Sequence, residues 1–166
     1  MSAERAATLP KKFIGRFSLK EVLLARRTSG MGSGSTFARS MHAVDTNVLV
    51  RLVVRDNPEQ VRIAESFVAP GAWVSHLVLA EVMWVLDAVY DRTSEQIALA
   101  VEMLLDHKSL SIQDAAVVTS ALEIFRSYPA LGFSDCMVVE IARKAGHVSL
   151  GTFDRGLAKI NSVNRL

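Results

Sequence analysis

Apolar residues follow two alternating patterns from Met41 to the end of the chain. Short runs of mostly apolar residues alternate with longer stretches in which apolar residues recur every three or four positions. The short runs are typical of strands, and the three-to-four spacing is typical of helices. The predicted strands span residues 42–44, 72–74, 110–112 and 148–150. The predicted helices span residues 46–54, 58 to the break at 70–71, 77–90, 94–106, 115 to the proline at 129, and 134–145, with one more short helix after 154.

Polar residues stand at several of the predicted helix starts, where a side chain can accept a hydrogen bond from a free backbone N–H. Asn57, followed by a proline, is a strong start signal. Thr93 and Gln96 have the spacing of a capping box. Asp114 and Ser134 are the predicted caps of the next two helices. These signals set the predicted starts of four helices.

The alternation of short strands with helices indicates the class of fold. It is typical of an α/β fold, in which helices cover both faces of a short parallel sheet. The connection between two parallel strands is almost always right-handed. Ligands in such sheets bind beyond the carboxyl ends of the strands. The pattern therefore predicts one α/β domain over residues 41–166, with its site at those strand ends.

Residues 1–40 differ in composition from the rest of the chain. They hold eight Lys/Arg and two Glu, a net charge of +6, whereas residues 41–166 hold 11 Lys/Arg and 15 Asp/Glu, a net charge of −4. The stretch 28–35 is rich in glycine and serine. Three interpretations are open: a disordered tail, an arm that binds a membrane or a nucleic acid, or sequence upstream of a natural start at Met41, which we favour. The basic charge is therefore no evidence of an RNA groove in the domain.

The sequence lacks features that several classes of protein require. No apolar run is long enough to cross a membrane. The single cysteine, Cys136, allows no internal disulfide, which fits a reducing cytoplasm. The sequence has no Cys/His cluster with zinc spacing, no glycine loop for phosphates and no recognisable nucleophile elbow. We therefore expect a cytoplasmic protein that does not use a membrane.

Four acidic residues stand where this fold would place a site. Asp45 ends the first predicted strand, and Asp154 follows the fourth, so both are expected at the same edge of the sheet. Asp135 lies in the first turn of the helix that Ser134 is predicted to cap. Glu81 lies in the most apolar helix, and its neighbours three and four positions away are all apolar. Its carboxylate is therefore expected to be half-buried.

Carboxylates that gather in one place repel each other, and their burial is costly unless something compensates for it. A divalent cation removes this conflict, and oxygen ligands favour Mg²⁺ or Mn²⁺ over zinc. Taken singly, Asp45 could be a helix cap, Asp135 a favourable charge at a helix start and Asp154 a turn residue. Glu81 is harder to explain in this way, because an apolar helix gains nothing from an internal carboxylate. The joint placement of the four acids, rather than any one of them, predicts a metal site.

The segments around these acids resemble the motifs of PIN-domain nucleases, especially the VapC-type toxins of type II toxin–antitoxin pairs. The stretch AVDTNVLVRLVVRDNPEQ resembles the first motif, in which a strand-ending Asp is followed by Thr or Ser and Asn. The stretches LVLAEVMWVL, GFSDCMVVEIARKAGH and LGTFDRGLAKI resemble the segments that carry the other three acids. The resemblance covers residues 41–166. Residues 1–40 have no counterpart in the short members, and position 136 is Cys where small residues are more usual.

The resemblance implies a PIN-like fold of three layers, with a short central parallel sheet between helices. The family's catalytic acids fall on Asp45, Glu81, Asp135 and Asp154. Asp45, Asp135 and Asp154 are expected to bind the metal directly or through water, and Glu81 to hold a metal-bound water. Three neighbouring residues are expected to orient carboxylates or water: Thr46, Asn47 and Thr152. Arg155 is a candidate contact for phosphate.

The activity that the resemblance implies is a metal-dependent endoribonuclease, which cleaves RNA phosphodiesters with a water activated by Mg²⁺, or by Mn²⁺ as a substitute. A toxin of this kind implies a neutralising antitoxin protein as partner. The apolar helices at 46–54 and 77–90 predict a homodimer. Two alternatives are open: a catalytically silent PIN-like module that binds RNA or a protein, and a DNA nuclease or phosphatase on the same fold. The sequence does not specify which RNA is cut.

Overall fold

The strands of the computed structural model form two separate parallel sheets. The structure describes residues 41–166, so the interpretations of residues 1–40 lie outside the described part. Strands β1 (His42–Ala43), β2 (Ala72–Val74) and β3 (Leu110–Ile112) form one sheet in the order β1-β2-β3. Strands β4 (Leu150–Thr152) and β5 (Val163–Arg165) form the other. The parallel sheet with its helices confirms the predicted α/β fold.

The fourth strand is a correction to the sequence-based expectation. It lies two residues later than predicted, and it pairs with β5 instead of extending the first sheet. Its register is set by this pairing, in which Leu150 lies opposite Val163 and Thr152 opposite Arg165. The sequence pattern missed β5, in which only Val163 is apolar and buried and the other two residues are polar and exposed. A segment with one apolar residue gives no apolar run to detect.

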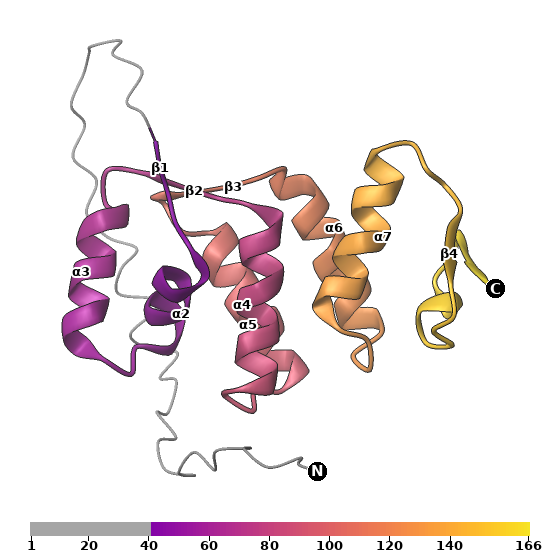
Figure 1. The fold of residues 1–166 in the computed structure, drawn as a ribbon, viewed down its shortest axis with the longest axis horizontal. Coiled ribbons are helices and arrows are strands. Elements are labelled where there is room, and N and C mark those ends of the chain that lie inside the picture. The colour runs from indigo at the N-terminus through magenta and orange to yellow at the C-terminus, as the bar shows by residue number, and fades with distance from the viewer. Residues whose placement is uncertain (1–40) are drawn as a thin grey trace, which may run out of the picture. The chain divides into compact units, whose positions relative to one another are not determined.

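The helices agree closely with the predicted ones. Two helices connect each pair of consecutive strands up to β4: α2 and α3 lie between β1 and β2, α4 and α5 between β2 and β3, and α6 and α7 between β3 and β4 (Figure 1). The short 3-10 helix η1 lies between β4 and β5. Their bounds are α2 Thr46–Val54, α3 Pro58–Val68, α4 His76–Ala88, α5 Ser94–Leu105, α6 Ala115–Ser127, α7 Phe133–Lys144 and η1 Leu157–Lys159. No helix among residues 41–166 is long and apolar enough to cross a membrane.

Two of the four predicted caps are confirmed and two need correction. The Asn57 side chain accepts a hydrogen bond from the N–H of Gln60, and Thr93 with Gln96 forms the complete capping box. Asp114 stands at the start of α6, but its backbone is left-handed (φ 40°) instead of extended as at a usual N-cap, and its side chain makes no cap bond. Helix α7 begins two residues earlier than the predicted cap allows, because Gly132 rather than Ser134 is its N-cap.

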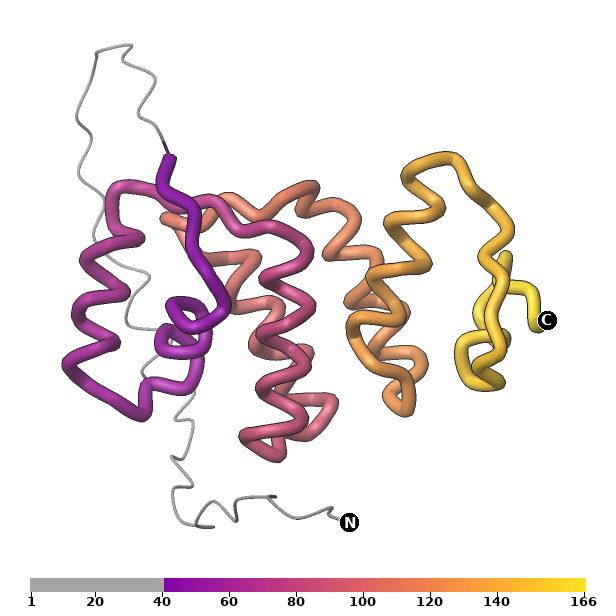
Figure 2. Tube along the Cα trace, viewed as in Figure 1, coloured from indigo at the N-terminus to yellow at the C-terminus, as the bar shows by residue number. Residues whose placement is uncertain are grey.

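Most of the buried side chains form one core between the first sheet and helices α2–α7. A second, smaller cluster lies on the other side of α7, where the C-terminal segment of the chain packs (Figure 2). Its buried members are Val139, Leu157, Ile160 and Val163. Helix α7 therefore belongs to both clusters, because it contributes Cys136 and Met137 to the first and Val139 to the second.

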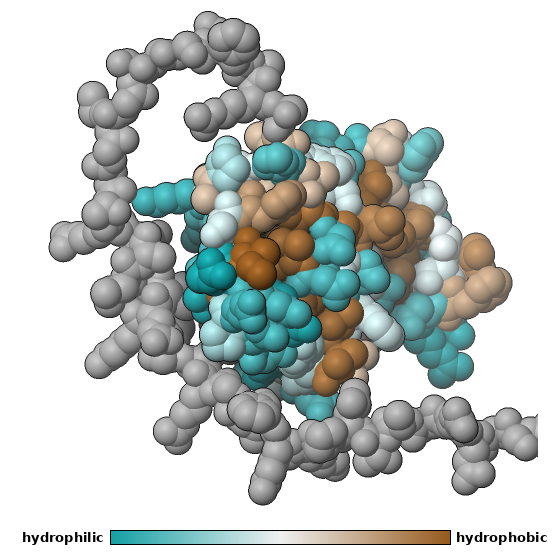
Figure 3. Space-filling model, turned by 60° about the vertical axis from the view of Figure 1, so that its left-hand side comes forward, coloured by the Kyte–Doolittle hydropathy of each residue, from teal (hydrophilic) through white to brown (hydrophobic). Residues whose placement is uncertain are grey.

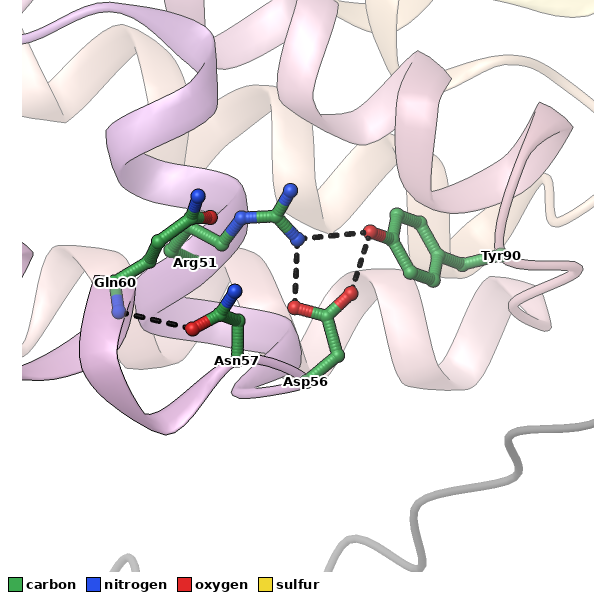
Figure 4. Close-up of polar contacts among 5 residues, drawn as sticks. All are labelled: Arg51, Asp56, Asn57, Gln60 and Tyr90. Atoms are coloured by element: carbon green, nitrogen blue, oxygen red, sulfur yellow. Dashed lines mark hydrogen bonds and ion pairs between the residues drawn. The ribbon is translucent and has the colours of Figure 1, made fainter.

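A polar network joins the end of α2 to the end of α4 (Figure 4). Arg51 Nη1 lies 2.6 Å from Asp56 Oδ1, and the Tyr90 hydroxyl donates to Asp56 Oδ2 at 3.0 Å. Burial raises the pKa of Asp56, but the hydrogen bonds from Arg51 and Tyr90 outweigh it and hold this pKa below its ordinary value. The network therefore stabilises the folded chain above the ordinary pKa of an Asp, and this contribution is lost as the pH falls through the lowered value.

Candidate functional site

Asp45 connects the end of β1 to the start of α2. The preceding residue, Val44, donates its N–H to the carbonyl of Trp73 in β2, so the chain is held in the sheet up to this point. Asp45 then caps α2, because its Oδ1 accepts a hydrogen bond from the N–H of Val48 at 3.0 Å. Its side chain is exposed. Capping thus uses one carboxylate oxygen and leaves the carboxylate open to solvent.

Glu81 lies beside this helix start. The hydroxyl of Thr46 donates to Glu81 Oε2 at 2.5 Å, which ties the first residue of α2 to the middle of α4. Glu81 is exposed, so the expectation of a half-buried carboxylate is wrong. The reason is that α4 packs Leu79, Val82, Met83 and Leu86 into the core and leaves Leu77, Glu81 and Trp84 on the opposite face. The apolar neighbours of Glu81 that suggested burial are therefore partly exposed themselves.

Asp135 lies in the first turn of α7, as predicted, although the cap is Gly132. A Cβ at Gly132 would come within 3.1 Å of Asp135 Oδ2, so the absence of a side chain there leaves room for the carboxylate. Asp135 is exposed, whereas the next residue, Cys136, is fully buried. Burial, and then the charge of Asp135, raise the pKa of Cys136 to about 12. The thiol is therefore a packing group at neutral pH and no nucleophile.

Asp154 lies in the loop between β4 and η1. Its N–H donates to the hydroxyl of Thr152 at 3.0 Å, and its Oδ1 accepts from the N–H of Leu157 at 2.7 Å. Gly156 brings this loop against the connection between α6 and α7, since an added Cβ would lie 3.0 Å from Leu131 Cδ2 and 3.1 Å from Asp154 Oδ1. Leu131 directly precedes the cap of α7. The loop of Asp154 therefore lies against the start of the helix that carries Asp135.

The local contacts described above connect the four predicted acids in two sets. We call Asp45, Thr46 and Glu81 the β1 half-site, and Asp135 with Asp154 the β4 half-site. Asp45 and Asp154 follow strands of different sheets, so the expectation that they share one sheet edge is wrong. Figure 1 shows α4, α6 and α7 between β1 and β4. The physical reason is that β4 pairs with β5 and packs on α7 through its own apolar cluster.

In the part of the chain that the structure describes, no three His, Cys, Asp or Glu side chains lie close enough together to hold one ion. The side chains are nevertheless of the right kind, because each half-site offers exposed carboxylate oxygens, which hard divalent cations prefer. Among residues 41–166, the five ion pairs all use other acids, such as Asp56, Glu65 and Glu102.

Of the other predicted site residues, Thr46 and Thr152 make hydrogen bonds to the predicted acids, and Asn47 and Arg155 are exposed beside them. Thr46 and Thr152 each bind a group of a predicted acid, as residues that orient a carboxylate or its loop would do. Asn47 and Arg155 are exposed next to these residues. Sequence reasoning missed the two glycines, Gly132 and Gly156. Their signal was present, because each lies within three residues of a predicted acid, in GFSD and DRG.

Comparison with known proteins identifies the family. The model of the PIN domain matches residues 43–163, a span that begins in β1, ends in β5 and includes all four predicted acids. Searches of the curated proteins and of the solved structures found no match. The match covers most of the chain, and the fold agrees with it. The chain therefore belongs to the PIN-domain family, whose members are generally metal-dependent nucleases.

Proposed function

We propose that this chain is a metal-dependent endoribonuclease, with Mg²⁺ as its ion and Mn²⁺ as a substitute. The observation that supports this most directly is the contact of Thr46 with Glu81, one residue after Asp45. The Thr46 hydroxyl fixes the carboxylate of Glu81 close to the exposed carboxylate of Asp45. Two carboxylates held in this way are suited to orienting a water molecule. The family match supports a nuclease. The all-oxygen character of the two half-sites supports a hard ion rather than zinc.

Cleavage of a phosphodiester requires a water that is oriented and loses a proton, and a site that tolerates the charge of the phosphate. Asp45, Asp135 and Asp154 are our candidates to hold the metal ion, directly or through water, because all three are exposed. Glu81, which Thr46 holds beside the start of α2, is our candidate to orient and deprotonate the water. Arg155 is exposed beside Asp154, where it can contact a phosphate of the substrate.

We further propose a toxin role, with an antitoxin protein as partner and a homodimer as the assembly. Leu77 and Trp84 of α4, and Val89 directly after it, are exposed apolar residues that support a protein contact on this helix. Figure 3 shows apolar residues exposed among hydrophilic ones on one face of the molecule. Helix α2 offers no comparable surface, because Leu49, Val50, Leu52 and Val53 are buried within the chain. We therefore assign a contact of this kind to α4 rather than to α2.

The proposal is tested with a panel of substrates: structured and single-stranded RNA, DNA of the same sequences, and a small phosphate ester. We expect cleavage of RNA with Mg²⁺ or Mn²⁺ and none in excess EDTA. Full activity in EDTA would contradict the metal requirement. Cleavage of DNA or the ester instead of RNA would favour the phosphatase or DNA-nuclease alternative. Absence of all cleavage, with no heat of Mn²⁺ binding in calorimetry, would favour the silent binding module.

The Thr46–Glu81 contact makes a separate prediction. Thr46→Val keeps the shape of the side chain but removes the hydroxyl, so Glu81 loses the bond that orients it. We expect RNA cleavage to fall roughly 10-fold or more. Thr46→Ser restores the hydroxyl and is expected to recover most of the activity. Single-turnover rates of the three proteins provide the measurement, and equal rates for Thr46→Val and the unchanged protein would remove this role.

A further inference from the structure

Two backbone hydrogen bonds join the carboxyl end of β2 to its neighbouring strands. On one side, the N–H of Val44 donates to the carbonyl of Trp73 at 3.2 Å, and Asp45 follows directly. On the other side, the N–H of Gln113 donates to the carbonyl of Val74 at 2.8 Å. Helix α4 begins two residues after β2 ends. The same edge of the first sheet therefore sets the position of Asp45 and of the start of α4.

The side chain of Gln113, which directly follows β3, reaches from this edge to α4. Its Oε1 accepts a hydrogen bond from the N–H of His76, the first residue of the helix, at 3.0 Å. The first N–H groups of a helix have no partner inside it, so each needs an acceptor from outside. Ser75 supplies one from the preceding loop, because its Oγ accepts from the N–H of Val78 at 3.2 Å. Gln113 supplies another from a different strand, and so ties α4 to the end of β3.

The position of α4 matters for the candidate site because Glu81 lies in this helix. Glu81 is five residues beyond His76, which corresponds to about 7.5 Å along a helix. The backbone hydrogen bonds of a helix keep its residues at a fixed spacing, so a shift of the helix start is passed on to Glu81. Its contact with Thr46 is one hydrogen bond, which is lost when the two oxygens move apart by about 1 Å.

We propose that Gln113 is a positioning residue of the site: it holds the start of α4 at the end of β3 and so keeps Glu81 within reach of Thr46. The proposal rests on the proposed nuclease function, in which Glu81 orients the water. Gln113 acts through the helix and touches none of the reacting groups. A misplacement of about 1 Å that arises far from the chemistry can cost roughly 100-fold in rate, so a remote hydrogen bond is able to influence cleavage.

Two substitutions of Gln113 separate its hydrogen bond from its bulk. Gln113→Met keeps the length of the side chain but removes the carbonyl oxygen, and is expected to lower kcat roughly 5-fold with little change in KM. Gln113→Glu keeps an oxygen that can accept the N–H of His76, and is expected to retain most of the activity. Equal kcat for Gln113→Met and the unchanged protein, a rise in KM alone, or an equal loss in Gln113→Glu would each overturn the proposal.

The matched control is Gln60→Met. Gln60 is exposed on α3, and its backbone N–H rather than its side chain binds Asn57. Its kcat and KM are therefore expected to equal those of the unchanged protein. Urea unfolding of all variants confirms that the rates refer to folded chains.

A double-mutant cycle tests whether Gln113 acts through Glu81. Thr46→Val already removes the hydrogen bond to Glu81, so adding Gln113→Met is expected to lower kcat by less than roughly 2-fold further. If the two losses multiply in the double variant, Gln113 acts by another route and the proposal fails. A purely structural role of Gln113 predicts this multiplied loss.

A third measurement does not depend on activity. The NMR resonance of the Glu81 side-chain carboxyl carbon, assigned by its disappearance in Glu81→Gln, reports the hydrogen bond from Thr46 directly. Gln113→Met is expected to shift this resonance in the same direction as Thr46→Val, and Gln113→Glu is expected to leave it in place. No shift in Gln113→Met would overturn the positioning role. If the shift occurs while the unchanged protein cleaves no RNA, the positioning of Glu81 stands and the nuclease function fails.

Discussion

Asp45→Asn is expected to lower the rate of RNA cleavage roughly 100-fold or more, with almost no change in the free energy of unfolding. The substitution removes the negative charge and the basic carboxylate that the proposed site needs. It keeps an oxygen that can accept the N–H of Val48, so the cap of α2 is retained. Single-turnover cleavage and urea unfolding measure the two effects separately.

Two comparison variants make this result specific. Asp87→Asn removes an exposed acid from α4 and leaves the proposed site intact, so its activity is expected to be unchanged. Asp45→Ala removes both the carboxylate and the cap, and is expected to lose about 1 kcal/mol of stability together with the activity. If Asp45→Asn cleaved RNA at the unchanged rate, Asp45 would be a structural cap and the assignment of the site would be wrong.

Leu79→Ala is expected to lower the free energy of unfolding by about 2–5 kcal/mol. Leu79 is 0% exposed in α4, and this helix packs against α2, α5 and α7. Removing its side chain leaves a cavity between elements that cannot close around it. A loss of this size is a large fraction of the roughly 5–15 kcal/mol that stabilises a typical domain. Urea denaturation followed by circular dichroism provides the measurement.

The matched control lies two residues away on the same helix. Leu77 is 78% exposed, so Leu77→Ala is expected to change the stability by less than about 0.5 kcal/mol. Both variants replace Leu with Ala in α4, so they change the helix propensity equally. A difference in their stability therefore measures the effect of burial alone. A loss for Leu77→Ala as large as that for Leu79→Ala would mean that the exposed face of α4 is covered in solution.

Much of the local structure follows from the sequence alone. The predicted bounds of α2, β2 and β3 agree with the structure residue for residue. The capping box of Thr93 and Gln96 was predicted from two residue types at a fixed spacing. These features depend on residues within one or two turns of each other. For the same reason, the sequence placed Asp45 at a strand end and Asp135 in a first helical turn.

Other local predictions failed where a backbone angle or a packing direction decided the outcome. Asp114 has a capping side chain, but its left-handed backbone prevents the cap bond. Glu81 is surrounded by apolar residues in sequence, yet it lies on the face of α4 that is turned away from the core. An apolar helix has no distinct polar face, so its periodicity cannot indicate which side is buried.

The sequence by itself determined the order of strands and helices in this protein, the residues that begin most helices, and the acids that stand at strand ends. Only the tertiary structure decided that β4 pairs with β5 in a sheet of their own, and that this segment packs on α7 through a second apolar cluster. The physical reason is the separation in sequence over which each interaction acts. Helix caps and apolar periodicity act between residues close in sequence, whereas strand pairing is a choice among distant edges that depends on what each segment packs against.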